Sequence, residues 1–424
     1  MLKVYKNRII DEKISKYLQI YGAILISGPK WCGKTSTGEF NSKSQFYLGD
    51  PTGNFSNRSI ATMDPRIVLS GEYPRLIDEW QDVPSIWDAV KFETDKMEEK
   101  GLFILTGSST PMRKGIRHTG AGRIAKISMR TLSLYEMGFS KGYISFRDLC
   151  KKSVEKRMFE DISLENIIDY ILIGGWPANI GKKITQCSKV AKEYIDAIFD
   201  EESFKFDGKR RNRLKFSLLL KSLARNDNSL ISNKTLVKDL NENNNGNSIN
   251  EETVAEYIDI LERLYLLENI EPFSQKIRSS IRVRVGKKIR FTDPSITCAI
   301  LQMTKEKLLK DLNTLGILFE SMCYRDLLTY AESNDFKIYH YHDYRNNEVD
   351  AICELDDGSY VAIEIKLGAN QIDDAAKSLI KFKENILKDG KEPPSKLIVI
   401  CALSNACYKR SDGVEVVSLL HLKN

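Results

Sequence analysis

A glycine-rich segment near the start of the chain has residue types and spacing suited to holding a phosphate. The residues "GPKWCGKTS", 28–36, follow an apolar run and match the pattern G-x-x-x-x-G-K-[ST]. Glycines let backbone N–H groups close around phosphate oxygens, so we expect Lys34 to reach the β- and γ-phosphates and Thr35 to bind Mg²⁺. The expected nucleotide-contacting residues are Gly28, Pro29, Lys30, Trp31, Cys32, Gly33, Lys34, Thr35 and Ser36.

An acidic pair and a hydroxyl-bearing strand end could complete this chemistry. In "PRLIDEW" two apolar residues precede Asp78, which would hold the metal, and Glu79, which would polarise the attacking water. The next apolar run, residues 102–105, leads into Thr106 and Ser108, either of which could sense the γ-phosphate or orient water. A polar strand end with no catalytic part is the alternative for these two hydroxyls.

Two arginines follow within a short distance, Arg123 at the end of "GAGR" and Arg130. In a homo-oligomer, an arginine that reaches the γ-phosphate of a neighbouring subunit would stabilise transition-state charge, an effect of about 10³–10⁵ in rate. A solvated or phosphate-sensing arginine is the alternative. The sequence does not decide between them.

The elements that must position these residues belong to a folded chain of more than one domain. The 424 residues are 42% hydrophobic and 29% charged, and no apolar run approaches the length of a membrane span. Neither a signal-peptide core nor a CxxC pair occurs, which favours a cytoplasmic protein with eight reduced cysteines. The net charge of +6 permits nucleic-acid binding and does not require it.

The middle of the chain predicts a turn followed by a winged helix. "YILIGGWPANI", residues 170–180, reads as a sharp turn around Trp176, which we interpret as structural. Residues 211–292 predict three helices and a hairpin, and Val254, Ile258, Leu261 and Tyr265 have the spacing of one buried helix face. The asparagine-rich residues 241–250 predict a flexible loop before that third helix.

Charge is distributed unevenly over this predicted winged helix. The third helix is acidic, which disfavours major-groove contact; its acids are Glu251, Glu252, Glu256, Asp259 and Glu262. The wing is basic, and its cations are Lys276, Arg278, Arg282, Arg284, Lys287, Lys288 and Arg290. These could contact DNA phosphates, face solvent or meet an acidic protein partner, and a second basic stretch, residues 205–215, has the same three interpretations.

The last hundred residues predict an α/β domain with converging charged side chains. Asp350 lies on one predicted strand, and Glu364 and Lys366 lie on the next, after an Asp-Gly turn. Period-2 alternation sends Glu364 and Lys366 to one face, where they could meet Asp350. His340 and His342 also share a strand face, but we expect ordinary core or surface histidines rather than metal ligands.

Several of these segments together resemble a widespread prokaryotic family of AAA-type ATPases whose P-loop module precedes a C-terminal domain of unknown function. The similar segments are residues 28–36, "LIDEWQDVPSIWDAVK", "FILTGSS", "GAGRI" and "LSLYEMGF". The resemblance implies a Walker A role for residues 28–35 and a Walker B role for Asp78 and Glu79. It also implies a sensor role for Ser108 and favours Arg123 as the catalytic arginine.

Residues 310–405 resemble the restriction-endonuclease-like core with its D…ExK signature. The resemblance implies that Asp350 and Glu364 bind Mg²⁺, that Lys366 positions or activates water, and that Glu320 is an additional acid. Such cores also persist as binding platforms without activity.

The sequence therefore predicts an α/β protein of three domains: an AAA-type ATPase over residues 1–160, a helical and winged-helix linker over 161–300, and a restriction-endonuclease-like domain over 301–424. The expected activity is Mg²⁺-dependent ATP hydrolysis that moves the C-terminal parts, with catalytic roles for Lys34, Glu79, Ser108 and Arg123. Two alternatives stay open: a nucleotide-switched DNA nuclease, and an ATP-dependent module that recruits a protein through its winged helix and has an inactive nuclease-like domain.

Overall fold

The computed structural model describes residues 5–109, 119–199, 212–242, 249–275, 286–343, 345 and 347–424. They divide into two compact units. Unit 1 holds the N-terminal part as far as Thr131 together with Ile260–Leu266, and unit 2 holds Leu132–Phe199 and most of the later chain. The three predicted domains stay a prediction; residues 132–160, expected in the ATPase domain, are grouped with unit 2.

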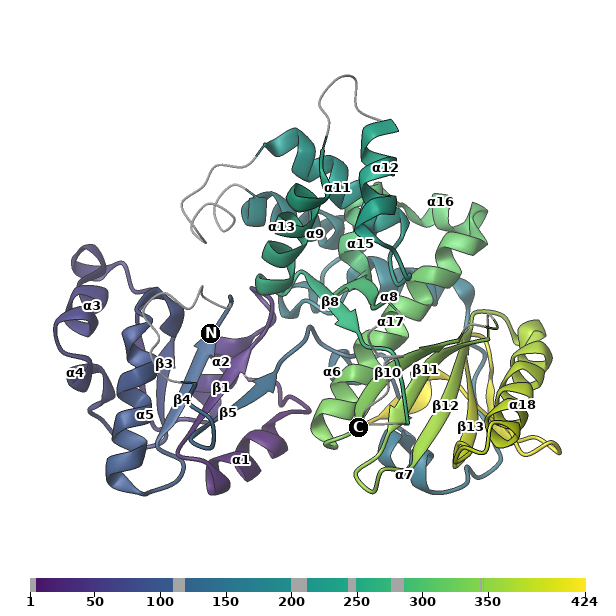
Figure 1. Cartoon of the computed structure of the whole chain (residues 1–424), viewed down its shortest axis with the longest axis horizontal. Coiled ribbons are helices and arrows are strands. Elements are labelled where there is room, and N and C mark those ends of the chain that lie inside the picture. Colours follow the sequence, from purple (N-terminus) through teal and green to yellow (C-terminus); the bar gives the residue numbers. More distant parts are fainter. Residues whose placement is uncertain are drawn as a thin grey trace. The chain divides into compact units, whose positions relative to one another are not determined.

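Unit 1 is built on a five-stranded parallel sheet (Figure 1). Its strands are β1 Ala23–Ser27, β2 Ser44–Tyr47, β3 Arg75–Asp78, β4 Phe103–Gly107 and β5 Ile124–Ser128, in the order β2-β3-β4-β1-β5. Its helices are α1 Asp11–Ile20, α2 Lys34–Phe40, α3 Thr52–Met63, α4 Pro65–Leu69 and α5 Ser85–Met97, with a 3-10 turn at Trp80–Asp82. Because β4 lies between β1 and β3, the residues after all three strands emerge at one edge of the sheet.

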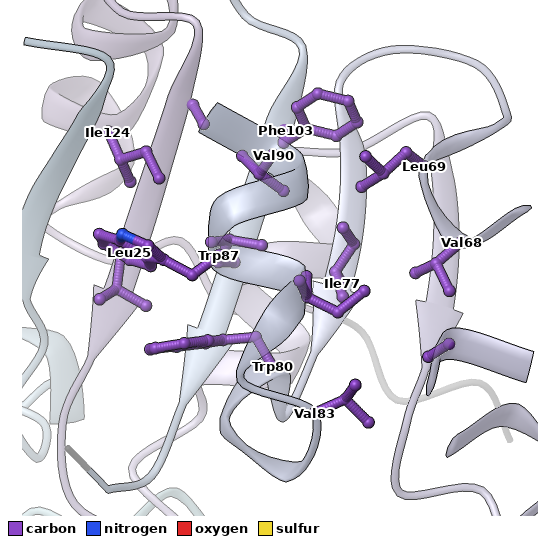
Figure 2. Close-up of a cluster of buried hydrophobic side chains, with 14 of the residues drawn as sticks. Leu25, Val68, Leu69, Ile77, Trp80, Val83, Trp87, Val90, Phe103 and Ile124 are labelled. Carbon is purple, nitrogen blue, oxygen red and sulfur yellow. The ribbon is translucent and has the colours of Figure 1, made fainter. Parts of the chain in front are cut away.

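Alternating apolar residues bury both faces of this sheet. On one face Leu25 and Ile77 pack in a cluster with Trp87 and Val90 of α5, as Figure 2 shows. On the other face Ile24, Ile26, Leu76 and Ile104 pack with Ile10 and Ile14, at and within α1. Strands that are apolar on both sides are typical of parallel sheets covered by helices. This double burial makes the carboxyl edge of the sheet a rigid base for a site.

Unit 2 contains a seven-stranded mixed sheet (Figure 1). In spatial order its strands are β10 Lys337–His342, β11 Glu348–Glu354, β12 Tyr360–Lys366, β13 Lys396–Cys401, β15 Glu415–Val417, β14 Ala406–Lys409 and β7 Arg157–Met158. Short pairs join β8 Leu267–Ile270 to β9 Lys288–Phe291 and β6 Ile144–Ser145 to β16 Leu422–Lys423. The strand β7 comes from the predicted ATPase range and pairs with β14, which explains why residues 132–160 belong to unit 2.

Among the described residues that follow β5, the two longest helices are α17 Leu312–Ser333 and α18 Ile372–Lys388. The described helices between β5 and β8 are α6 Leu134–Met137, α7 Phe146–Lys151, α8 Leu164–Ile173, α9 Ile184–Ala197, α11 Arg213–Arg225, α12 Asn233–Glu242 and α13 Glu251–Arg263. Those after β9 are α15 Pro294–Leu301, α16 Lys305–Lys310, α17 and α18. Single 3-10 turns are formed by Pro177–Asn179, Ala369–Gln371 and Leu419–His421. The long α18 buries Leu379 and Phe382 in the cluster that covers β12 and β13.

The predicted order of three helices and a strand pair is present as α11, α12, α13, β8 and β9. Val254, Ile258 and Leu261 are buried as predicted. Tyr265 is not on that helix face, because α13 ends at Arg263 and Tyr265 takes a left-handed conformation with φ 55°. The acids Glu251, Glu252, Glu256 and Asp259 are exposed. Most of the predicted wing, residues 276–285, and most of the asparagine-rich and second basic stretches lie outside the described residues.

The segment around Trp176 is fixed by hydrogen bonds to the start of α15. The Gly175 N–H donates to Asp293 Oδ2 at 2.8 Å, and the Trp176 indole N–H donates to Ser295 Oγ at 2.9 Å. Gly174 has φ 65°, and a Cβ there would lie 2.3 Å from Ser295 Oγ, so only glycine fits. These contacts agree with a structural interpretation of this turn.

Two further features concern the cysteines and the apolar character of the helices. All eight cysteines are free and buried, as expected for packing residues. Within the described ranges, none of the helices combines the length and the apolar character needed to cross a bilayer.

Candidate functional site

The phosphate-binding pattern forms the turn between β1 and α2. Gly33 has φ 101°, a conformation that favours glycine, and the helix begins at Lys34. Gly28 passes so close to Met129 that an added Cβ would lie 2.0 Å from its carbonyl oxygen. Arg8 donates to the Cys32 carbonyl at 2.9 Å and so ties the far side of the turn to the N-terminal segment. The turn is therefore held from two sides.

Lys34 and Thr35 both point into this turn rather than away from it. Lys34 is 5% exposed, and its Nζ donates to the Pro29 carbonyl at 2.8 Å. The Thr35 hydroxyl donates to Asp78 Oδ1 at 2.9 Å. Thr35 and Asp78, the two residues predicted to bind Mg²⁺, thus lie side by side at the carboxyl edge of the sheet. Thr35 lies in the helix after β1, and Asp78 lies at the end of β3.

The acidic pair and the strand β4 meet at the same edge. Asp78 is buried and also accepts a hydrogen bond from Thr106, while Glu79 accepts one from Ser108 Oγ at 3.0 Å. Glu79 has φ 57°, so the chain turns sharply after β3. The two carboxylates therefore have different partners: Asp78 accepts from Thr106 in β4, and Glu79 accepts from Ser108 just after β4. Burial raises the pKa of Asp78, and the hydrogen bond from Thr106 acts in the opposite direction. Five predicted residues, Lys34, Thr35, Asp78, Glu79 and Ser108, therefore converge.

Sequence reasoning missed two residues of this site. Gln81 donates its amide N–H to Glu79 Oε2 and lies 3.5 Å from Ser108 Oγ, so it helps to hold the glutamate. Arg8, 7% exposed, was given no part. Neither residue belongs to a known sequence motif. The only local signal is that Gln81 lies two residues after Glu79, in a 3-10 turn that brings its side chain back to the site.

The two arginines lie at opposite edges of the sheet. Arg123 precedes β5, its carbonyl accepts from Ala23 at the amino end of β1, and its side chain pairs with Asp95. It is therefore not brought together with Lys34 and Glu79 within one chain, and a role across a subunit interface stays a prediction. Arg130 follows β5 at the carboxyl edge, where its backbone carbonyl accepts from Arg8 at 2.9 Å.

A second group of charged residues lies in unit 2, and we call Glu320, Glu348, Asp350 and Glu364 the carboxylate cluster. The register Ala351↔Ile363 continues to place Asp350 opposite Glu364. Lys366 Nζ lies 3.0 Å from Asp350 Oδ2 and 2.6 Å from Glu364 Oε2. The predicted convergence of Asp350, Glu364 and Lys366 is therefore present. Burial, followed by the charge of Asp350, raises the pKa of both Glu364 and Glu320.

Two of the predicted wing cations are part of this interior rather than the surface. Lys288 is 3% exposed and pairs with Glu320 at 3.1 Å and with Glu348 at 3.2 Å. Arg290 is fully buried and pairs with Glu268 at 2.8 Å. The expectation of a DNA-facing or solvated surface is wrong for these two, because alternate residues of β9 point inward and meet carboxylates. Lys287 is exposed and pairs with Glu271.

No described group of three His, Cys, Asp or Glu side chains is arranged to hold a metal ion. At the edge of unit 1 this does not conflict with the prediction, because nucleotide-bound Mg²⁺ usually takes only one or two protein ligands. At the carboxylate cluster, Mg²⁺ binding by Asp350 and Glu364 stays a prediction, and the structure places Lys366 and Lys288 beside the cluster carboxylates. His340 is buried, and burial followed by the charge of Lys288 lowers its pKa to about 4, in line with a core histidine.

Comparison with known proteins covers three successive parts of the chain. Residues 21–138 match the family model of the AAA domain. Residues 164–307 and 315–422 match two domains of unknown function, DUF8612 and DUF4143. Neither of these two models carries the description of a winged helix or a nuclease.

Relatives are distant. An uncharacterized protein of Mycobacterium tuberculosis and one of Mycobacterium bovis are each 22% identical over 365 residues, which are 85% of this chain and 74% of theirs. The Walker-type ATPase of Pyrococcus abyssi is 13% identical with a TM-score of 0.41, over 69% of this chain and 94% of its own. The ORC2 protein of Aeropyrum pernix is 12% identical with a TM-score of 0.30, over 75% and 92%. The match of residues 21–138 to the AAA domain agrees with the parallel sheet and the P-loop turn found in this part of the chain.

Proposed function

We propose that unit 1 binds ATP and hydrolyses it with Mg²⁺. The observation that carries this proposal is the convergence of Lys34, Thr35, Asp78, Glu79 and Ser108 at one edge of a parallel sheet, from three different strands and their turns. Phosphoryl transfer needs positioned charge rather than covalent chemistry, and these are the side chains that supply it.

Each of these residues would have a separate task. Lys34 would leave the Pro29 carbonyl for phosphate oxygens, and Mg²⁺, which neutralises phosphate charge, would be held by Thr35 and Asp78. Glu79 would take the proton of the attacking water, with its carboxylate oriented by Ser108 and Gln81. The fit is good because Thr35 and Asp78 already face each other at hydrogen-bond distance.

The Lys34→Ala variant is expected to lose ATP binding by at least tenfold, because Lys34 is buried in the turn and its ammonium already lies among the backbone groups that would surround the phosphates. Isothermal titration with ATP and Mg²⁺ measures this directly. Lys100→Ala is the matched control, since Lys100 is exposed just before β4, at the amino edge of the sheet. Equal affinities for the Lys34→Ala variant and the wild type would refute the proposal.

For the rest of the chain we propose a binding role that responds to the nucleotide state of unit 1. The order α11, α12, α13, β8, β9 supports a winged-helix-like linker, and the position of Asp350 opposite Glu364 supports a restriction-endonuclease-like core. DNA or a protein partner would bind here. Direct major-groove contact by α13 is disfavoured by its exposed acids.

A DNA cleavage assay distinguishes this binding role from the DNA nuclease alternative, which requires cleavage. We expect no cleavage of labelled single- or double-stranded DNA by the full chain with Mg²⁺ or Mn²⁺, with or without ATP. The reason is that Lys366 and Lys288 already neutralise the cluster carboxylates. Cleavage that disappears in Asp350→Ala, and persists in the exposed control Asp356→Ala, would establish the nuclease instead.

A further inference from the structure

Lys288 has the surroundings of a bound cation rather than of a surface lysine. Its side chain is 4% exposed, and its ammonium lies 3.1 Å from Glu320 Oε1 and 3.2 Å from Glu348 Oε1. The ring of Tyr324 lies 5.8 Å away, within the range of a cation–π contact. A buried ammonium costs several kcal/mol unless opposite charges and acceptors surround it. Lys288 is therefore a buried cation whose charge is compensated by two carboxylates.

The strand that carries Lys288 is fixed on both sides. Asn228 N–H donates to the Ile289 carbonyl at 2.9 Å, and Ile289 N–H donates to the Ser229 carbonyl at 3.1 Å. On the side of the large sheet, His340 Nε2 lies 3.1 Å from the Gly286 carbonyl oxygen. These contacts fix the backbone on both sides of Lys288, and the ion pairs with Glu320 and Glu348 hold its ammonium.

Lys288 and Lys366 divide the carboxylate cluster between them. Lys366 pairs with Asp350 and Glu364, while Lys288 pairs with Glu320 and Glu348, so every carboxylate of the cluster has an ammonium partner. Asp350 Oδ2 also accepts the Ile365 N–H at 2.7 Å. Mg²⁺ requires near-octahedral oxygen ligands at about 2.0–2.1 Å. One oxygen of each of the four carboxylates already faces an ammonium, and no triad of acids or histidines among the described residues is placed for a metal.

We propose that Lys288 is the resident cation of the carboxylate cluster: its ammonium takes the place of a divalent metal, and the folded chain binds neither Mg²⁺ nor Mn²⁺ there. The β8–β9 pair is thereby joined electrostatically to the sheet that carries Asp350 and Glu364. Removing the ammonium leaves Glu320 and Glu348 without it and opens the cluster to a divalent ion. This inference does not depend on ATP hydrolysis in unit 1.

The test measures Mn²⁺ binding to the nucleotide-free full chain, by the loss of the free Mn²⁺ signal in electron paramagnetic resonance. Wild type and Asp350→Asn are expected to bind Mn²⁺ equally, because any Mn²⁺ held by unit 1 does not involve Asp350. Lys288→Met is expected to gain Mn²⁺ binding that the double variant Lys288→Met, Asp350→Asn loses. Lys287→Met, which removes an exposed neighbouring lysine, is expected to behave as wild type.

Two results would overturn the proposal. One is Mn²⁺ binding by the wild type that Asp350→Asn abolishes, since the cluster would then hold a metal with Lys288 in place. The other is a folded Lys288→Met variant, with wild-type circular dichroism, that gains no Mn²⁺ binding. If Lys288→Met does not fold, Lys288→Gln replaces it, and the comparison of wild type with Asp350→Asn still decides the central point.

Discussion

The Glu79→Gln variant is expected to bind ATP as the wild type does and to hydrolyse it about 10²–10⁴-fold more slowly, the usual cost of removing a general base. The amide keeps the size of the side chain and its contacts with Ser108 and Gln81, but cannot take a proton from water. Phosphate release under saturating ATP, beside ATP affinity measured by titration, separates the two steps.

Glu72→Gln is the control for this prediction, because Glu72 is an exposed glutamate before the amino end of β3. It should hydrolyse ATP at the wild-type rate. If Glu79→Gln also kept that rate, another group would have to accept the proton. If it lost ATP binding instead, the role of Glu79 would be in holding the nucleotide.

The Arg325→Met variant is expected to lose about 3–5 kcal/mol of the free energy of unfolding of unit 2, the typical cost of leaving buried charge uncompensated. Arg325 is fully buried between Asp293, at 3.3 Å, and Asp326, at 2.8 Å. Both carboxylates also accept backbone N–H groups, from Gly175 and Leu134 respectively, so they cannot turn away. The measurement is urea unfolding of the full chain, followed at the transition of unit 2.

Arg225→Met is the matched control for buried charge. Arg225 pairs with Asp239, but its side chain is 50% exposed, so the expected loss is about 1 kcal/mol or less. Similar losses for the two variants would show that the charge network around Arg325 contributes no more than a surface pair. In that case the segment around Trp176 would depend on its other contacts.

The nucleotide site could be predicted because its signals are local. A run of nine residues carries the turn, Asp78 ends the strand β3, and Glu79 and Ser108 each directly follow a strand. The rule that parallel strands end at one edge then brings them together. Arg8 and Gln81 could not be predicted in this way, because their contacts depend on how the N-terminal segment and a 3-10 turn return to the site.

In the carboxylate cluster, too, some positions could be predicted from local patterns and others could not. Period-2 alternation and the Asp-Gly turn placed Asp350, Glu364 and Lys366 correctly, since all three lie on one hairpin. Lys288 was predicted on a wing surface because its neighbours in sequence are basic. Its position is decided by pairing of β9 with residues 228–229 and by carboxylates far along the chain, which no local pattern encodes.

The measurement that tests the central claim most directly is the rate of phosphate release from ATP by the purified full chain with Mg²⁺, compared between wild type and Lys34→Ala. We predict steady turnover by the wild type that falls to background in the variant, with Lys100→Ala unchanged. Turnover by Lys34→Ala at the wild-type rate would contradict the assignment of ATP hydrolysis to this site, and so would a folded wild type without any turnover.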